Sequence, residues 1–298
     1  MPNKIWRVVE LLDWTSGYFE QHSIPTPRLD AEVLLGHLLN KSRLQLYLDF
    51  DMPVFQEHLT PFRKLIQRRI ERTPVSYLTN RKEFLSLDFY VDERVLIPRP
   101  ETEQLVETIL ATKTETSQRV LELGTGSGVI ATSLAVHASA WDIVATDISE
   151  PALEVAQQNA ETHACSAQIT FMSGDLFEPI KMIENPEERQ FDWIVCNPPY
   201  IKNVERDSLS LDVRDYEPEI ALFAGDDGLT VIRRLITEAP QYLAPNGKLL
   251  FEIGDTQADP VRALINGEPA YCTYELIRDY AEKDRLVFAS VSSAHVPV

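Results

Sequence analysis

From about residue 100 onward, short apolar runs alternate with helical stretches, and this alternation limits the fold more than any other feature of the chain. A typical helical stretch is SEPALEVAQQNAETH, with Ser149 as the expected N-cap and Pro151 in the first turn. The apolar runs predict strands, and they lie in RVLELGTG, WDIVATD, AQITFMSGD, FDWIVC and GKLLFEIG. Repeated units of this kind predict an α/β fold with a mainly parallel sheet covered by helices on both faces.

Residues 1–76 have a different texture, because their apolar side chains recur at helical spacing. Breaks at residues 23–28 and 51–53 separate three such groups: Ile5, Val8, Val9 and Leu12; Ala31, Leu34, Leu35, Leu38 and Leu39; Phe62, Leu65, Ile66 and Ile70. We therefore expect a small all-α domain over 1–76. Extended residues between Phe84 and Ile97 predict a β-hairpin linker over 77–98, and the α/β domain then occupies 99–298.

Charge is spread unevenly along the 298 residues. Residues 1–80 hold 10 Lys or Arg against 9 Asp or Glu, a net charge of +1, so the rest of the chain carries −19 and the total is −18. An acidic body repels phosphate, which disfavours indiscriminate binding to DNA or RNA. Five basic residues gather at Arg63, Lys64, Arg68, Arg69 and Arg72. A solvated helix face is the favoured interpretation of this cluster, and a surface for an acidic partner is the alternative.

The chain has no run of about 18 apolar residues and no pattern of a secretion signal. We therefore expect a cytoplasmic protein without a membrane segment. The three cysteines, Cys165, Cys196 and Cys272, have neither the spacing of a metal site nor that of a disulfide framework, so no metal is proposed.

A glycine-rich turn follows the first predicted strand of the α/β region. In LELGTGSG, Gly124, Gly126 and Gly128 stand at alternate positions between strand and helix, where a ligand can approach the backbone N–H groups. Asp147 ends the next strand and can accept hydrogen bonds from both hydroxyls of a ribose. The turn is therefore a candidate nucleoside site.

The charge of the residues around the turn favours one class of nucleoside over another. The Gly-x-Gly-x-Gly spacing differs from a dinucleotide fingerprint, and the acidic Glu122 disfavours a phosphate. A carboxylate attracts a cation, such as the amino group or sulfonium of S-adenosylmethionine. As an alternative, Glu122 hydrogen-bonds the N–H groups of its own loop. Asp175, after the third strand, is placed to bind an adenine amino group, with a loop cap as the alternative.

The stretch FDWIVCNPPYI ends a buried strand in Asn197-Pro198-Pro199-Tyr200, because two prolines cannot donate to a neighbouring strand. The Asn197 side-chain carbonyl and the Pro198 backbone carbonyl are two acceptors that match the two hydrogens of a planar NH₂ group. Binding both hydrogens directs the nitrogen lone pair and stabilises the positive charge that develops on it. Tyr200 can cover the planar group as a stacking wall.

This motif, together with the glycine turn, resembles the amino-methylating branch of the S-adenosylmethionine-dependent methyltransferases. Further stretches are similar to the peptide chain release factor glutamine methyltransferases: PRLDAEVLLGHLL, LYLDFD, PVSYLTNRKEF, VLIPRPETEQLVE and YEPEIALFAGDDGL. The resemblance spans nearly the whole chain. It implies a Rossmann-like class I methyltransferase domain with a mostly parallel seven-stranded sheet, preceded by a small all-α domain that recognises the substrate.

The resemblance also implies residue roles and a partner. The substrate would be the glutamine in the Gly-Gly-Gln motif of class 1 peptide chain release factors, methylated on its side-chain amide. Separately, we expect the enzyme to be a monomer. Four groups of residues carry the implied roles: Asn197, Pro198 and Tyr200 in catalysis; Asn197, Pro198, Pro199 and Tyr200 on the substrate; Glu122, Gly124, Thr125, Gly126, Gly128, Asp147, Asp175, Leu176 and Asn197 on S-adenosylmethionine; Arg99, Pro100, Glu101 and Thr102 in a lid.

Two positions depart from the family pattern. Asn80 stands where a glycine is usual, and Leu176 stands where relatives often have an aromatic residue on adenine, a role that Phe177 could take instead. Three alternatives stay open at this point: a glutamine methyltransferase of a large-subunit ribosomal protein, an adenine N6 methyltransferase of DNA or RNA, and a cofactor sensor without activity. The connection over 178–190 is expected to be a surface loop.

Overall fold

A computed structural model describes residues 5–112 and 117–296. The chain forms two compact units. The first, here called the helical unit, comprises the chain up to Arg81 together with Ser210–Tyr216, and the second, the sheet unit, comprises Lys82–Leu209 and the chain from Glu217 onward. The expected linker over 77–98 is thus divided at Arg81, and the sequence did not indicate that Ser210–Tyr216 groups with the helices.

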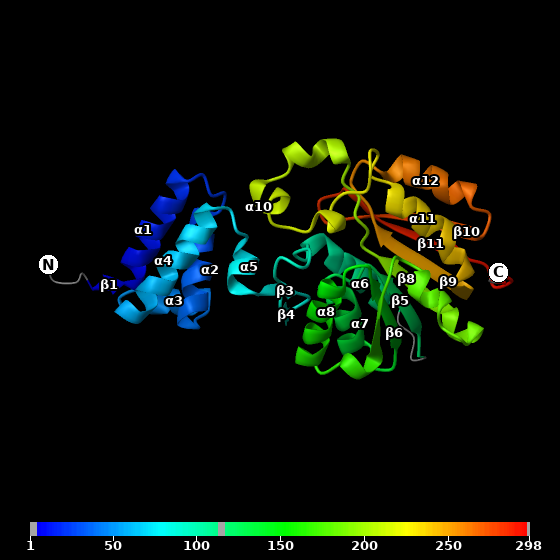
Figure 1. Ribbon diagram of the computed structural model, residues 1–298, viewed down its shortest axis with the longest axis horizontal. Coiled ribbons are helices and arrows are strands. Elements are labelled where there is room, and N and C mark those ends of the chain that lie inside the picture. The colour runs from blue at the N-terminus through cyan, green and yellow to red at the C-terminus, as the bar shows by residue number, and fades with distance from the viewer. Residues whose placement is uncertain (1–4, 113–116, 297–298) are drawn as a thin grey trace. The chain divides into compact units, whose positions relative to one another are not determined.

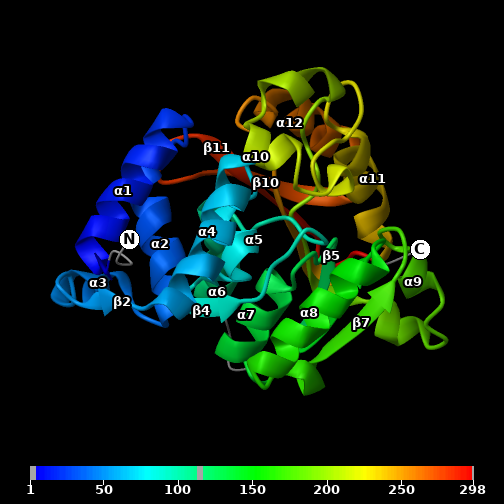
Figure 2. The same cartoon turned by 60° about the vertical axis from the view of Figure 1, so that its left-hand side comes forward.

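The helical unit confirms the three helices predicted from apolar spacing and adds short elements between them. Figures 1 and 2 show α1, α2 and α4 side by side in this unit. Its elements are β1 (Trp6–Arg7), α1 (Val8–Gln21), α2 (Pro27–Leu39), α3 (Arg43–Leu48), β2 (Pro53–Val54), α4 (Gln56–Ile70), α5 (Val75–Thr79) and α10 (Leu211–Arg214). The two-residue strands β1 and β2 pair antiparallel.

The inner face of α4 holds one charged side chain among apolar ones. Phe62 and Ile66 are buried in the core of the bundle, as expected. Arg69, however, has only 3% of its surface exposed, and its guanidinium binds Asp30 at 2.7 Å and Asp212 at 2.9 Å. The expectation that Arg69 lies on a solvated face was therefore wrong. Burial of the arginine is compensated by the two carboxylates.

The sheet unit confirms the expected α/β fold. Within the described residues its main sheet has seven strands in the order β10-β11-β9-β8-β5-β6-β7. Only β11 runs antiparallel to its neighbours, β9 and β10, and the other pairs are parallel. The strands of this sheet are β5 (Arg119–Leu123), β6 (Asp142–Asp147), β7 (Ile169–Ser173), β8 (Phe191–Cys196), β9 (Leu243–Glu252), β10 (Tyr271–Arg278) and β11 (Asp284–Val291).

Helices cover both faces of this sheet because its strands are apolar on both sides. Alternate residues of β5 illustrate this, since Val120 packs in one core and Leu121 in the other. The first core joins the sheet to α6 (Glu103–Ala111), α7 (Val129–His137) and α8 (Glu150–Thr162), and the second to α9 (Glu178–Lys181), α11 (Thr230–Glu238) and α12 (Ala258–Gly267). Figure 1 shows both helical layers.

Local sequence signals placed several element ends correctly. The strand β5 ends at Leu123 and α7 begins at Val129, and Ser149 caps α8 by accepting from the Ala152 N–H. The expected hairpin is present as β3 (Lys82–Phe84) and β4 (Leu87–Phe89), which pair antiparallel and occupy only part of the range 77–98. One local expectation was wrong, because residues 178–190 contain α9 and the 3₁₀ turn η3 (Pro186–Arg189) rather than a plain loop. Buried Ile180 holds that segment on the core.

The carboxyl ends of the parallel strands meet at one edge of the sheet, where ligands bind in folds of this kind. Gly124 follows β5, Asp147 ends β6, Asp175 follows β7, Asn197 follows β8 and Glu252 ends β9. Over residues 5–112 and 117–296, no helix has the length and apolar character needed to cross a membrane.

Candidate active site

A cavity of about 340 Å³ opens at this edge of the sheet unit. Its size falls within the range of small-molecule sites. The structure brings most of the predicted site residues together on its walls: Thr102, Glu122, Gly124, Thr125, Gly126, Asp147, Asp175, Leu176, Asn197, Pro198 and Pro199. Gly128, Tyr200, Arg99, Pro100 and Glu101 are not on its walls.

The three glycines of the turn have positive φ angles of 70°, 55° and 78°, a region that side chains with a Cβ disfavour. A Cβ on Gly124 or Gly126 would meet no atom within 4 Å, so the backbone there is open to a ligand. A Cβ on Gly128 would lie 2.9 Å from the Cβ of Ala156 in α8. Gly128 therefore permits close packing of α7 against α8, and only the first two glycines face the cavity.

Glu122 is buried beneath the turn, with 1% of its surface exposed. Its Oε2 accepts from the Thr125 hydroxyl at 2.8 Å and from the Ala131 N–H at 3.0 Å, so this oxygen ties the loop to α7. Its Oε1 accepts no hydrogen bond from any residue in the described ranges. Burial, with a smaller effect of the Asp147 charge, raises the pKa of Glu122 to about 8. The side chain can thus cap its loop through one oxygen and bind a cation through the other.

Asp147 is held by backbone donors. One carboxylate oxygen accepts from the Gly126 N–H at 2.8 Å and the other from the Ser149 N–H at 2.9 Å. Burial raises the pKa of Asp147 above its ordinary value, and these hydrogen bonds oppose the change. Each oxygen keeps a further lone pair for a ribose hydroxyl.

The wall after β7 is formed by Asp175 and Leu176. Asp175 accepts two hydrogen bonds from Arg234, at 3.0 and 2.8 Å, so its charge is already partnered. Leu176 lines the cavity with a φ of 49°. Phe177 is fully buried and stacks on Tyr242 with ring centroids 4.7 Å apart. Leu176, and not Phe177, is therefore the residue that faces the adenine position expected from the sequence.

The Asn197-Pro198-Pro199-Tyr200 motif leaves β8 at the cavity. The Asn197 Nδ2 donates to Thr102 Oγ1 at 3.1 Å. Neither Asn197 Oδ1 nor the Pro198 carbonyl accepts a hydrogen bond from the part of the chain that the structure describes. Both acceptors are therefore available to a ligand, which is the arrangement that a planar NH₂ group requires.

Comparisons with known proteins show the family of this chain. Two family models match, the PrmC N-terminal domain over residues 10–79 and the Methyltransferase small domain over residues 100–211. A protein of Rhodopirellula baltica named release factor glutamine methyltransferase is 39% identical over 287 residues, which cover 95% of each chain. The chain belongs to the release factor glutamine methyltransferase family. A second relative with this name, from Geobacter sulfurreducens, is 39% identical and covers 95% of this chain and 96% of its own.

Solved structures support the methyltransferase fold of this family member. A methyltransferase from Pyrococcus furiosus covers 80% of this chain and 100% of its own, with a TM-score of 0.51 and 16% identity. The catalytic domain of hMettl16 in complex with the MAT2A 3'UTR hairpin 6 covers 80% of this chain and 84% of its own, with a TM-score of 0.54 and 18% identity. At these identities the likeness shows the fold alone.

In this family member, the segment expected to act as a lid is anchored at two points. Arg99 donates to both oxygens of Glu217, at 2.7 and 2.8 Å. Thr102, at the end of the 3₁₀ turn η1 (Pro100–Thr102), is 2% exposed and donates to Glu252 at 2.8 Å. Thr102 is thus an internal residue of the site.

The sequence did not reveal two acidic residues of this family member's site. Glu252 accepts from Thr102 and from the Tyr200 hydroxyl, and Glu217 holds Arg99. The available signal was a carboxylate in an otherwise apolar strand, GKLLFEIG, where a charge needs a partner. Among the residues that the structure describes, no cluster of three or more His, Cys, Asp or Glu side chains is arranged to hold a metal ion.

Proposed function

We propose that this enzyme transfers a methyl group from S-adenosylmethionine to the side-chain amide nitrogen of the glutamine in the Gly-Gly-Gln motif of peptide chain release factors. The names of its relatives support this substrate class. One observation carries the chemistry: Asn197 Oδ1 and the Pro198 carbonyl lie at the cavity without a hydrogen-bond donor among the described residues, and together they match the two hydrogens of a primary amide.

The walls of the cavity fit the proposed cofactor. The open backbone at Gly124 and Gly126 gives room for a nucleoside, and Asp147 has lone pairs for its ribose. Glu122 Oε1 is an acidic group without a partner among the described residues, suited to a cation. S-adenosylmethionine, when bound, supplies a methyl group on a positively charged sulfur. These three features together favour it over a nucleotide with a phosphate.

The residues of the motif have separate tasks in this proposal. Asn197 and Pro198 bind the two hydrogens of the amide and so direct its nitrogen lone pair toward the donor. They also stabilise the positive charge that develops on the nitrogen. The nitrogen gains the methyl group as the bond between that group and the donor sulfur breaks, which leaves a neutral thioether, and the nitrogen loses one proton to solvent. Positioning of this kind, rather than a strong base, supplies the rate enhancement. We expect the enzyme to act as a monomer, and the cavity residues of this chain all belong to the sheet unit. We expect the reaction to take place in the cytoplasm.

A transfer assay tests the proposal. Labelled S-adenosylmethionine is offered with four acceptors: a purified release factor, its variant with the motif glutamine changed to alanine, a large-subunit ribosomal protein fraction and duplex DNA. We expect label in the release factor alone. Label that persists in the alanine variant, or that enters ribosomal protein or DNA in preference, would contradict the proposed substrate.

A further inference from the structure

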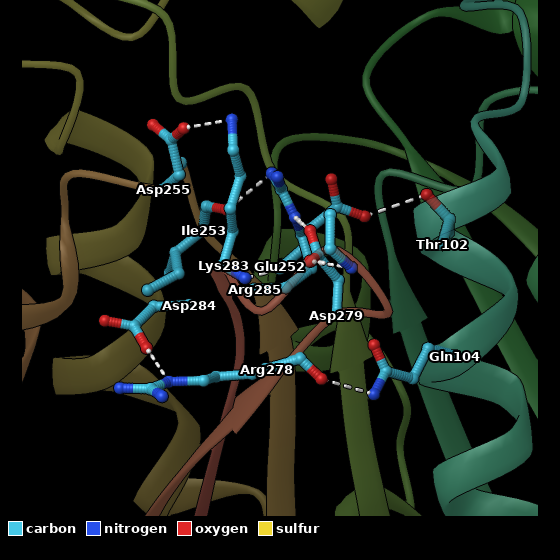
Figure 3. A network of polar contacts seen from close by, with 12 residues as sticks. Thr102, Gln104, Glu252, Ile253, Asp255, Arg278, Asp279, Lys283, Asp284 and Arg285 are labelled. Carbon is cyan, nitrogen blue, oxygen red and sulfur yellow. Dashed lines mark hydrogen bonds and ion pairs between the residues drawn. The ribbon is translucent and has the colours of Figure 1, made fainter.

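Glu252 is a buried carboxylate behind the substrate-binding motif. It ends β9 with 1% of its surface exposed. Oε2 accepts from the Thr102 hydroxyl at 2.8 Å, and Oε1 accepts from the Tyr200 hydroxyl at 3.1 Å. Figure 3 shows Thr102 reaching from the start of α6 toward Glu252. Burying a carboxylate costs free energy, so its position calls for a physical reason.

Hydrogen-bond direction supplies that reason. An ionised carboxylate can only accept, so Thr102 must direct its single hydroxyl proton to Glu252. The Thr102 oxygen is then left with lone pairs, and it accepts from the Asn197 Nδ2 at 3.1 Å. The chain of bonds therefore runs from Asn197 through Thr102 to Glu252. Because Asn197 must donate to Thr102, its Nδ2 faces Thr102 and its Oδ1 points away.

The opposite orientation would prevent the proposed chemistry. If the Asn197 amide turned over, its NH₂ group would stand where the acceptor is required and would meet the NH₂ group of the substrate. Two donors cannot satisfy one another. A hydroxyl group can donate or accept, so on its own Thr102 would tolerate both orientations of the Asn197 amide. Because its proton is already donated to Glu252, Thr102 can only accept from Asn197, and one orientation is favoured.

We propose that Thr102 and Glu252 are positioning residues, which hold the Asn197 amide oxygen toward the substrate nitrogen and fix the Tyr200 side chain from the same carboxylate. This inference rests on the function proposed above. Glu252 thereby holds both ends of the Asn197–Tyr200 motif: it binds the Tyr200 hydroxyl directly, and it orients Asn197 through Thr102.

The surroundings of Glu252 agree with this role. Burial raises the pKa of Glu252, and the hydrogen bond from Thr102, the charge of Arg285 and the hydrogen bond from Tyr200 oppose this shift. Arg285 binds Asp279 at 3.1 Å and the Ile253 carbonyl at 3.2 Å, and Figure 3 shows these contacts beside Glu252. The arginine supplies charge without occupying either oxygen of Glu252, so both oxygens stay free to accept from Thr102 and Tyr200.

A matched pair of variants at Thr102 tests the proposal. Thr102→Val keeps the size of the side chain but removes its hydroxyl, and Thr102→Ser keeps the hydroxyl. We expect Thr102→Val to lower kcat for release factor by roughly 10- to 100-fold. Thr102→Ser should stay within about threefold of wild type. Calorimetric affinity for S-adenosylhomocysteine should be the same in all three proteins, which also shows that each is folded.

A binding measurement adds a readout that does not depend on turnover. Wild-type enzyme with S-adenosylhomocysteine should prefer release factor with the native motif glutamine over its Gln-to-Glu variant, because the fixed acceptors repel a carboxylate. In Thr102→Val the Asn197 amide can turn over and donate, so this preference should shrink by about tenfold. A loss of packing alone would weaken both complexes equally and leave the ratio unchanged.

Glu252→Gln is a second variant with the same shape, and we expect it to lower kcat by roughly tenfold with cofactor affinity retained. Full activity in both Thr102→Val and Glu252→Gln, or an equal loss in Thr102→Val and Thr102→Ser, would overturn the positioning role. Absence of transfer by the wild-type enzyme would instead overturn the proposed function and this inference with it. The two failures are therefore distinguishable.

Discussion

Because burial raises the pKa of Glu122, we expect cofactor binding to release a proton from its carboxyl group. With a pKa of about 8, this carboxyl holds its proton at pH 7 in the cofactor-free enzyme, in about nine of ten molecules. A cation placed beside its free Oε1 favours the ionised form. If the pKa returns to its ordinary value of 4.5 on binding, the change corresponds to about 5 kcal/mol of interaction with the ionised carboxylate.

The expected proton count depends on pH. Glu122 should release about 0.9 proton per bound cofactor at pH 7 and only about 0.1 at pH 9, where most of the free enzyme is already ionised. Calorimetry of S-adenosylmethionine binding in buffers of different ionisation enthalpy measures this number. Glu122→Gln is the matched control, because it keeps an acceptor for Thr125 and Ala131 but cannot titrate. The difference between the two proteins removes the titration of the cofactor's own amino group.

Equal proton counts for wild type and Glu122→Gln at pH 7 would refute this reasoning. The carboxylate would then serve only to cap its loop, which is the alternative that the sequence left open. A count that differs at pH 7 and converges at pH 9 would support a direct contact between Glu122 and a cationic group.

Four further outcomes are expected. Without cofactor, the free energy of unfolding of wild type relative to Glu122→Gln should fall as the pH rises from the ordinary pKa of 4.5 to the folded pKa of about 8, and stay constant above it. Urea titrations at pH 6 and pH 9 measure this difference, and an equal difference at the two pH values would contradict it. Asn197→Ala should lower kcat by roughly 100-fold with cofactor affinity intact, and near-normal turnover would count against its role. Asp147→Ala should weaken cofactor affinity by roughly tenfold or more, and an unchanged calorimetric Kd would remove it from the site. Gly128→Ala should lower the free energy of unfolding by about 2–5 kcal/mol, because the left-handed backbone and the contact with Ala156 both disfavour a Cβ. Gly124→Ala should lower it by only about 1–2 kcal/mol, because a Cβ there meets no neighbouring atom. Equal losses of the two variants in chemical denaturation would contradict the packing argument.

Much of the sheet unit could be predicted because its signals are local. The end of β5 at Leu123 and the cap of α8 at Ser149 follow from residues within one turn of the boundary. The cavity residues after β5, β6, β7 and β8 followed from a rule of topology, since parallel strands present their carboxyl ends at one edge. These parts of the fold need no knowledge of which side chains meet.

The remaining parts depend on contacts between distant residues. Thr102 and Glu252 are 150 residues apart, and nothing near either one indicates the other. Gly124 and Gly128 look equivalent in LELGTGSG, yet only the helix packed against Gly128 gives it a separate role. The charge of Arg69 predicted exposure, and only its pairing with two distant carboxylates explains its burial.

The grouping of Ser210–Tyr216 with the helices limits how this enzyme can be divided. The polypeptide passes between the two units three times, and not once. A fragment ending at Arg81 would lose Asp212 and leave buried Arg69 with one carboxylate instead of two. Chimaeras that exchange the helical unit between relatives would therefore need to transplant two separate stretches of sequence together.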